Sequence, residues 1–228
     1  MSLLEVNDLS AFYNGSLALS EVDFLVNKGS VIALMGRNGV GKTTLIHCVC
    51  GLIKEKSGLI KFNSVSINKL IDFQIAKLGI GLVPEGRRIF SNLTVHENLL
   101  VSARKGEWDL RKIYDLFPRL FDRKYQLSSS LSGGEQQMLS IGRALMTNPK
   151  LLILDEATEG LSPLIQKEIW NVIAAIKKSG LSIIIVDKSL EKLSKVADYF
   201  YFLVKGRVAW NGKYDQLNDQ IIKHYLSI

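Results

Sequence analysis

The chain has 228 residues, 47% of them hydrophobic, which fits one globular domain with a sizeable core. Its longest aliphatic runs, at 151–154 and 183–186, fall far short of the ~20 residues that a membrane-spanning helix needs, so no such helix is expected. The formal net charge of +7 comes from scattered lysines and arginines rather than a basic block interleaved with aromatics, which argues against nucleic acid as the main partner.

Two further features indicate a soluble protein of the cytoplasm. No basic-then-apolar leader opens the chain, because its first residues already have a strand-like pattern. Cys48 and Cys50 lie two apart in a predicted helix and therefore face away from each other, so neither a disulfide nor a shared metal is expected. We expect both to be buried in a reducing compartment. Any attachment to a membrane is expected to come through a partner.

The first part of the chain is expected to be mainly β-strand. Alternation of apolar and polar residues predicts half-buried strands, and one continuous apolar run suits a buried central strand. A helix is expected from Lys42 to about Cys50, because Gly51 is placed to end it. The strands are expected at residues 22–26, 31–35, 59–62 and 80–83.

The middle of the chain changes to a helical spacing. Thr94 and Glu97 form a capping box, in which the two side chains satisfy free backbone donors at a helix start. Helical spacing continues over residues 110–120 and is interrupted at Pro118. Residues 128–130 are expected to be a short polar linker.

The rest of the chain alternates strand and helix, which predicts a mostly parallel sheet. We interpret residues 89–146 as a helical subdomain inserted into a core formed by residues 1–88 and 147–228. The expected elements are strands at 151–154 and 182–186, a helix at 164–178, a hairpin of 199–204 with 207–210, and one or two terminal helices from residue 214.

A phosphate-binding pattern follows the apolar run that ends at Met35. Residues 36–43 match G-x-x-x-x-G-K-T between a predicted strand and a predicted helix, so backbone amides and the helix dipole can hold a phosphate. Lys42 is expected to reach the β- and γ-phosphates of ATP, and Thr43 to ligate Mg²⁺. For this pattern alone, a plain glycine-rich turn is the alternative. Nucleotide contacts are expected from Gly36, Arg37, Asn38, Gly39, Val40, Gly41, Lys42, Thr43 and Thr44.

A pair of acidic residues ends the apolar run at 151–154. Asp155 stands where a carboxylate reaches Mg²⁺ in P-loop enzymes, and Glu156 follows it directly. Two acids that only cap the next helix are the alternative, which the phosphate loop makes less favourable.

A second anion site is predicted at residues 132–135. Ser132 and Glu135 fit a capping box, so a helix is expected to begin here and run towards Leu145. The amide-rich start of such a helix attracts anions. One chain cannot easily bring both anion sites onto one nucleotide. A capped helix without ligand is the alternative.

The order and the residues of the motifs at 36–43, 131–137 and 151–156 resemble those of the ATP-binding subunit of an ABC transporter. The resemblance covers nearly the whole chain. The resemblance implies an α/β fold of P-loop NTPase type, with a mostly parallel sheet, an antiparallel β subdomain and an inserted helical subdomain. It also implies an ATPase that converts ATP and water to ADP and phosphate, with ATP and Mg²⁺ bound.

The resemblance also implies partners. One partner is a second ABC ATPase subunit, in a homodimer or a heterodimer. The others are transmembrane permease subunits, which are driven when the dimer closes on ATP. A solute-binding protein outside the cell membrane is an indirect partner. The chain would then be cytoplasmic and peripheral on the inner face of the cell membrane.

Several residues receive a role from the resemblance alone. Glu156 matches the general base that orients and deprotonates the attacking water. Tyr13 lies where an aromatic stacks on adenine, although Phe12 could substitute and a core position for Tyr13 stays open. The residues that would face the γ-phosphate of ATP bound to the second subunit are Ser132, Gly133, Gly134 and Glu135.

The chain departs from the family pattern at three positions. Glu85 replaces a glutamine that touches Mg²⁺ and water, a role that a carboxylate can also fill. Ser162 replaces an aspartate in the loop after the acidic strand. Lys188 replaces the switch histidine, and we expect its ammonium to contact the γ-phosphate as a fixed charge.

Residues 84–90 and 93–95 resemble the ATPases of importers for branched-chain amino acids and for urea and short amides, and residues 35–41 resemble the urea-type members. Two other functions remain open. The departures at Ser162 and Lys188 allow a weakly hydrolysing regulatory clamp in a heterodimer. A soluble ABC ATPase acting on nucleic acid or ribosomes usually carries tandem domains or a long coiled coil, and this sequence shows neither.

Overall fold

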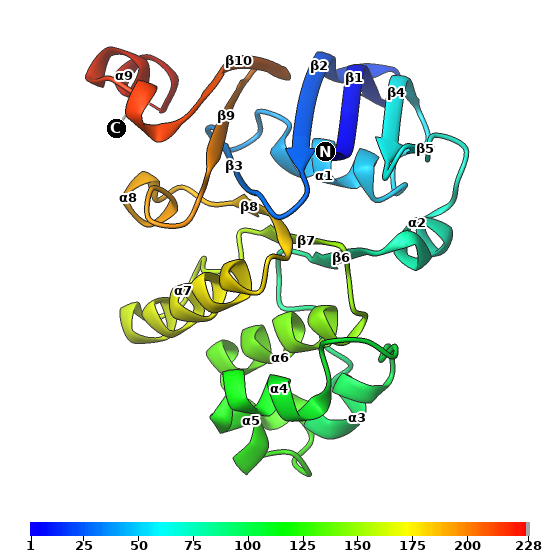
Figure 1. Cartoon of the computed structure of the whole chain (residues 1–228), viewed down its shortest axis with the longest axis vertical. Helices are drawn as coiled ribbons and strands as arrows, with labels where there is room; N and C mark the ends of the chain where they lie inside the picture. Colours follow the sequence, from blue (N-terminus) through cyan, green and yellow to red (C-terminus); the bar gives the residue numbers. More distant parts are fainter. Residues whose placement is uncertain (227–228) are drawn as a thin grey trace.

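The structure, a computed structural model that describes residues 1–226, is an α/β fold built on two sheets (Figure 1). The smaller sheet is antiparallel, with strand order β2-β1-β4-β5. Its two longest strands meet in a tight turn at Asn14 and Gly15, both with positive φ, as a hairpin between twisted strands requires. The strands are β1 (Ser2–Tyr13), β2 (Ser16–Asn27), β4 (Lys56–Phe62) and β5 (Val65–Ser66).

The larger sheet has strand order β10-β9-β3-β8-β7-β6. Every neighbouring pair is parallel except β10 with β9, and all residues of the three central strands are buried, as the apolar runs predicted. The carboxyl ends of these strands therefore meet at one edge of the sheet. The strands are β3 (Val31–Met35), β6 (Ile80–Val83), β7 (Leu151–Asp155), β8 (Ser182–Val186), β9 (Tyr199–Val204) and β10 (Arg207–Gly212).

The helices fall into two groups (Figure 1). Helices α3 to α6 gather at the end of the molecule away from the antiparallel sheet, and α6 packs against β6 and against α3, α4 and α5. The other helices flank the two sheets or follow the last strand. The helices are α1 (Lys42–Val49), α2 (Asp72–Leu78), α3 (Val95–Leu100), α4 (Leu110–Leu116), α5 (Pro118–Asp122), α6 (Gly133–Met146), α7 (Pro163–Lys178), α8 (Leu190–Leu193) and α9 (Asp219–Leu226).

Two hydrophobic cores lie on opposite faces of the larger sheet. In β3, Val31, Ala33 and Met35 face one core, while Ile32 and Leu34 face the other, because successive side chains of a strand alternate. The first core joins this sheet to α6 and α7. The second joins it to α1 and to the antiparallel sheet. Both faces of the sheet are therefore packed, and this packing supports the edge at which the loops after the parallel strands lie.

The local helix signals are confirmed. Both predicted capping boxes are present, with Thr94 and Glu97 at the start of α3 and Ser132 and Glu135 at the start of α6. The interruption at Pro118 separates α4 from α5, with Pro118 in the first turn of α5, where its missing N–H costs no hydrogen bond. Among the residues that the structure describes, no helix is both long and apolar enough to cross a membrane.

Residues 128–130 differ from expectation. They form a 3₁₀ turn rather than an open linker, and Ser128 is fully buried. Its hydroxyl donates to the carbonyl of Phe90 at 2.7 Å and accepts from the amide of Asn98 at 3.1 Å. Burying these polar groups is tolerated because each has a partner. The short helices α2 and α8 were also not predicted.

Candidate functional site

The phosphate loop connects β3 to α1 and depends on two glycines with positive φ. Gly36 has φ 149°, and a Cβ there would lie 2.5 Å from the carbonyl oxygen of Leu203. Gly41 has φ 108° and immediately precedes α1, and its Cβ would lie 2.7 Å from Leu19. Neither position has space for a larger residue, so the loop can adopt this path only with glycine.

Lys42 is held inside the loop. Its side chain is buried, and Nζ donates to the carbonyl oxygens of Gly36 and Arg37, both at 3.1 Å. The same ammonium lies 3.7 Å from Oε1 of Glu156. A buried ammonium whose partners are backbone carbonyl oxygens is suited to bind a phosphate, because the charged phosphate oxygens would replace these neutral acceptors.

Asp155 ends β7 beside the loop. It is 2% exposed, and Oδ1 has no hydrogen-bond partner among the described residues. Burial raises the pKa of this carboxyl, and a hydrogen bond with Thr43 partly opposes that rise. An unpartnered buried carboxylate oxygen next to a hydroxyl fits Mg²⁺, which prefers such oxygen ligands.

Glu156 directly follows Asp155 and has φ 49°, which is rare for a residue with a side chain. Its amide donates to the carbonyl of Val186 at 3.0 Å, so β8 helps to hold this conformation. Burial, together with the hydrogen bond and negative charge of Glu159, raises the pKa of Glu156 to about 7. The nearby ammonium groups of Lys188 and Lys42 oppose that rise.

Lys42 and Glu156 line one hollow of ≈ 410 Å³, whereas the buried Asp155 is not part of its lining. Glu85, after β6, joins the lining, and its carboxylate lies close to those of Glu156 and Glu159, with the three ligand oxygens within 4.8 Å of one another. The structure thus brings together the phosphate loop, Glu85 and Glu156, which are far apart in the sequence. The lining residues are Asn38, Gly39, Gly41, Lys42, Thr43, Thr44, Glu85, Glu156 and Glu159.

Lys188 lies beside this hollow rather than in it. It lines a neighbouring hollow of ≈ 340 Å³, which shares only Glu156 and Glu159 with the first. Its Nζ pairs with Oε1 of Glu159 at 2.6 Å and lies 4.0 Å from Oε2 of Glu156. Glu159 was not among the site residues predicted from the sequence, although an acidic residue three positions after Glu156 could have indicated it.

Two other candidate residues are placed by the structure. Tyr13, at the end of β1, is 48% exposed, so the alternative of a core tyrosine is wrong. Its ring does not line the hollow around Lys42. Ser162 is the N-cap residue of α7, but its side chain accepts no capping hydrogen bond.

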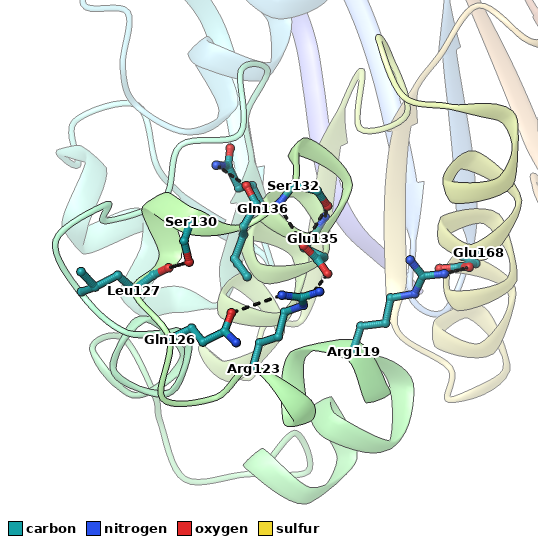
Figure 2. Close-up of polar contacts among 10 residues, drawn as sticks. Arg119, Arg123, Gln126, Leu127, Ser130, Ser132, Glu135, Gln136 and Glu168 are labelled. Carbon is teal, nitrogen blue, oxygen red and sulfur yellow. Dashed lines mark hydrogen bonds and ion pairs between the residues drawn. The ribbon is translucent and has the colours of Figure 1, made fainter.

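The start of α6 forms a separate polar group (Figure 2). The Ser132 hydroxyl and backbone N–H both donate to Oε2 of Glu135 at 2.8 Å, and Oε1 of Glu135 pairs at 2.7 Å with Arg123, which directly follows α5. A Cβ at Gly133 would meet only the guanidinium end of the flexible Arg87 side chain, which can move aside, whereas a Cβ at Gly134 would lie 2.7 Å from Ile165. Residues 132–135 do not line the hollow around Lys42, so within one chain the two predicted anion sites lie apart.

Comparisons with known proteins agree with this geometry. Residues 19–159 match the family described as ABC transporter. Among curated relatives, the chain is 40% identical to the high-affinity branched-chain amino acid transport ATP-binding protein BraG of Pseudomonas aeruginosa, covering 90% of this chain and 91% of that protein. It is 35% identical to the probable branched-chain amino acid transport ATP-binding protein LivF of Archaeoglobus fulgidus, covering 94% of each.

An export protein is also similar. The lipopolysaccharide export system ATP-binding protein LptB of Haemophilus influenzae is 32% identical, covering 98% of this chain and 96% of that protein. Among solved structures, the ADP conformation of an ATP-binding cassette of an ABC transporter aligns with TM-score 0.81 and 27% identity, covering 100% of this chain and 95% of that one. With the phosphate loop, Glu85 and Glu156 around one hollow, these likenesses show that the chain belongs to the ABC transporter family, as an ATP-binding subunit whose ATPase activity is coupled to transport.

Proposed function

We propose that this chain hydrolyses ATP to power the import of branched-chain amino acids or of related small amides and urea. The observation that carries the ATPase part is the shared hollow, where Lys42, Thr43 and Glu156 meet. The import of branched-chain amino acids is supported by the names of the two relatives at 40% and 35% identity, against 32% for the export protein.

In this proposal the chain's own residues bind and orient the reacting groups. Lys42 holds the β- and γ-phosphates, and Glu156 takes the proton from a water that attacks the γ-phosphate. Thr43, Asp155 and Glu85 hold Mg²⁺, which neutralises phosphate charge when it is bound. Lys188 contacts the γ-phosphate as a fixed positive charge. Tyr13 stacks on the adenine from its exposed position at the end of β1.

Two subunits complete the site. Since the start of α6 does not line the hollow, Ser132, Gly133, Gly134 and Glu135 are proposed to bind the γ-phosphate held by a second ATPase subunit. Residues 89–146, which include these four residues, then present them to the second subunit. Closure of the dimer drives the permease subunits in the membrane, and contact with these subunits places this chain on the inner face of the membrane. A solute-binding protein delivers the substrate.

The test uses the complex of this chain with its permease subunits in proteoliposomes. Wild type is expected to release phosphate and to take up labelled leucine, whereas Glu156→Gln, with the same size and no basic carboxylate, is expected to lose both by at least ~100-fold while still binding ATP. Equal phosphate release by the two proteins would exclude Glu156 as the base. Uptake of labelled urea without leucine would replace the branched-chain assignment.

A regulatory clamp with weak hydrolysis is the second candidate. It is favoured by the position of Lys188, whose ammonium pairs with Glu159 instead of facing the hollow around Lys42. The same experiment separates the two, because a clamp releases phosphate at the low rate of Glu156→Gln even in the wild-type complex.

A further inference from the structure

The loops that follow β7 and β8 are tied together beside the nucleotide hollow. The hydroxyl of Thr158, which is buried, donates to Oδ2 of Asp187 at 2.6 Å, and Oδ1 of Asp187 accepts from the amide of Ser189 at 2.8 Å. These bonds fix the backbone on both sides of Lys188. Its side chain therefore extends from an anchored point towards the loop that carries Glu156 and Glu159.

The Lys188 ammonium has two carboxylates within reach and contacts only one of them closely. The distance to Oε1 of Glu159 is 2.6 Å, while that to Oε2 of Glu156 is 4.0 Å. The other oxygen of Glu156 lies 3.7 Å from Lys42. Glu156 thus lies between two cations and forms a close contact with neither.

Stability does not account for the pair of Glu159 and Lys188. Their side chains are 48% and 49% exposed, and ion pairs at such exposure contribute little to the free energy of unfolding. Glu156, by contrast, is 13% exposed, where a direct ion pair is screened less. An ammonium on a flexible stem, once released from Glu159, has Glu156 as its nearest described carboxylate.

We propose that Glu159 is a positioning residue that holds the Lys188 ammonium away from direct pairing with Glu156. The oxygen of Glu156 that faces the nucleotide hollow then stays free to accept a proton from water. Glu159 acts through Lys188, and because its carboxylate also lies close to that of Glu156, a double-mutant cycle is needed to separate this route from a direct effect. This inference rests on the proposed role of Glu156 as the general base.

The test is a double-mutant cycle in the assembled complex, with Glu159→Ala and Lys188→Met alone and together. Methionine keeps the length of the stem without its charge. With Lys188 present, Glu159→Ala is expected to lower kcat by about tenfold, because the Lys188 ammonium then pairs with Glu156 and hinders it as a base. The KM for ATP is expected to change by less than about twofold, because the nucleotide contacts remain. With Met at position 188, the same substitution is expected to change kcat by less than about twofold.

Two controls accompany the cycle. Glu191→Ala removes another exposed glutamate–lysine pair, formed with Lys195 on α8, and is expected to leave kcat unchanged. Glu159→Gln keeps the size of the side chain, so it serves as a second variant in case alanine disturbs folding. It is expected to lower kcat when Lys188 is present and to change kcat little when methionine replaces Lys188.

Two results would overturn the inference. One is an unchanged kcat for both Glu159 variants when Lys188 is present, and the other is an equal loss in both backgrounds, which would mean that Glu159 acts directly. The proposed function fails separately, if Glu156→Gln hydrolyses ATP like wild type.

Discussion

At the scale of single residues, Glu156 combines a rare backbone conformation with a carboxylate between two ammonium groups. Its φ of 49° costs free energy, which the hydrogen bond to Val186 and the packed strands β7 and β8 offset. The gain is orientation, because this conformation places the carboxylate in the lining of the hollow around Lys42. Such strain is typical of functional positions.

The cysteines give a prediction at the same scale. Cys48 is 1% exposed and Cys50 is 8% exposed. Burial raises the pKa of Cys48 to about 11, with Lys56 opposing it, and burial with the charge of Asp155 raises that of Cys50 to about 12. Since the thiolate is the nucleophile, iodoacetamide at about pH 8 is expected to leave native protein unmodified.

Mass spectrometry measures the result. Protein unfolded in guanidinium chloride is the control and is expected to carry an adduct on each of its two cysteines. An adduct formed on the native protein at the rate seen for the unfolded one would contradict the burial of these thiols.

At the scale of elements, the start of α6 combines a capping box with an ion pair (Figure 2). Burial tends to raise the pKa of Glu135, but the hydrogen bonds from Ser132 and the charges of Arg123 and Arg119 outweigh it, so the pKa is lowered overall. The carboxylate therefore stabilises the folded state fully above its unfolded pKa of about 4.3, and this contribution is lost as pH falls through the lower folded value.

Glu135→Gln is accordingly expected to unfold more easily by about 2 kcal/mol at neutral pH, measured by urea denaturation. The difference from wild type is expected to shrink as pH falls below about 4. Glu97→Gln is the matched control, since Glu97 caps α3 in the same way but is exposed. A difference that stayed constant down to low pH would show that the charge of Glu135 contributes nothing.

At the scale of the whole molecule, sheet topology assembles the site from distant segments. Leu34 of β3 and Asp155 of β7 both pair with Val186 of β8, so β8 lies between them. The loops after these three parallel strands carry Lys42, Glu156 and Lys188. Residues 132–135 lie outside this edge, which is why the proposed active unit contains two ATPase subunits.

Gly133→Asp tests that proposal. An aspartate at the start of α6 is expected to repel the γ-phosphate of the second subunit, and to lower steady-state phosphate release by the complex by at least ~100-fold. Binding of a fluorescent ATP analogue to the isolated chain is expected to stay unchanged, because Gly133 does not line its own hollow. Weakened binding to the isolated chain would instead place residue 133 in the same-chain site.

The sequence alone determined the starts of α3 and α6, the central strands and the phosphate loop. These features depend on a few residues close together: the capping boxes join residues three apart, and an apolar run needs only to be buried on both faces. A single consecutive pattern, from Gly36 to Thr43, likewise specifies the loop and its glycines.

Only the tertiary structure decided which distant side chains meet. Lys188 pairs with Glu159 across 29 residues of sequence, and Ser128 is buried because Phe90 and Asn98, which are 38 and 30 residues away, satisfy its hydroxyl. No local spacing encodes such contacts, since they follow from the order of strands in the sheet and from where each loop ends. The exposure of Tyr13 was undecided from the sequence for the same reason.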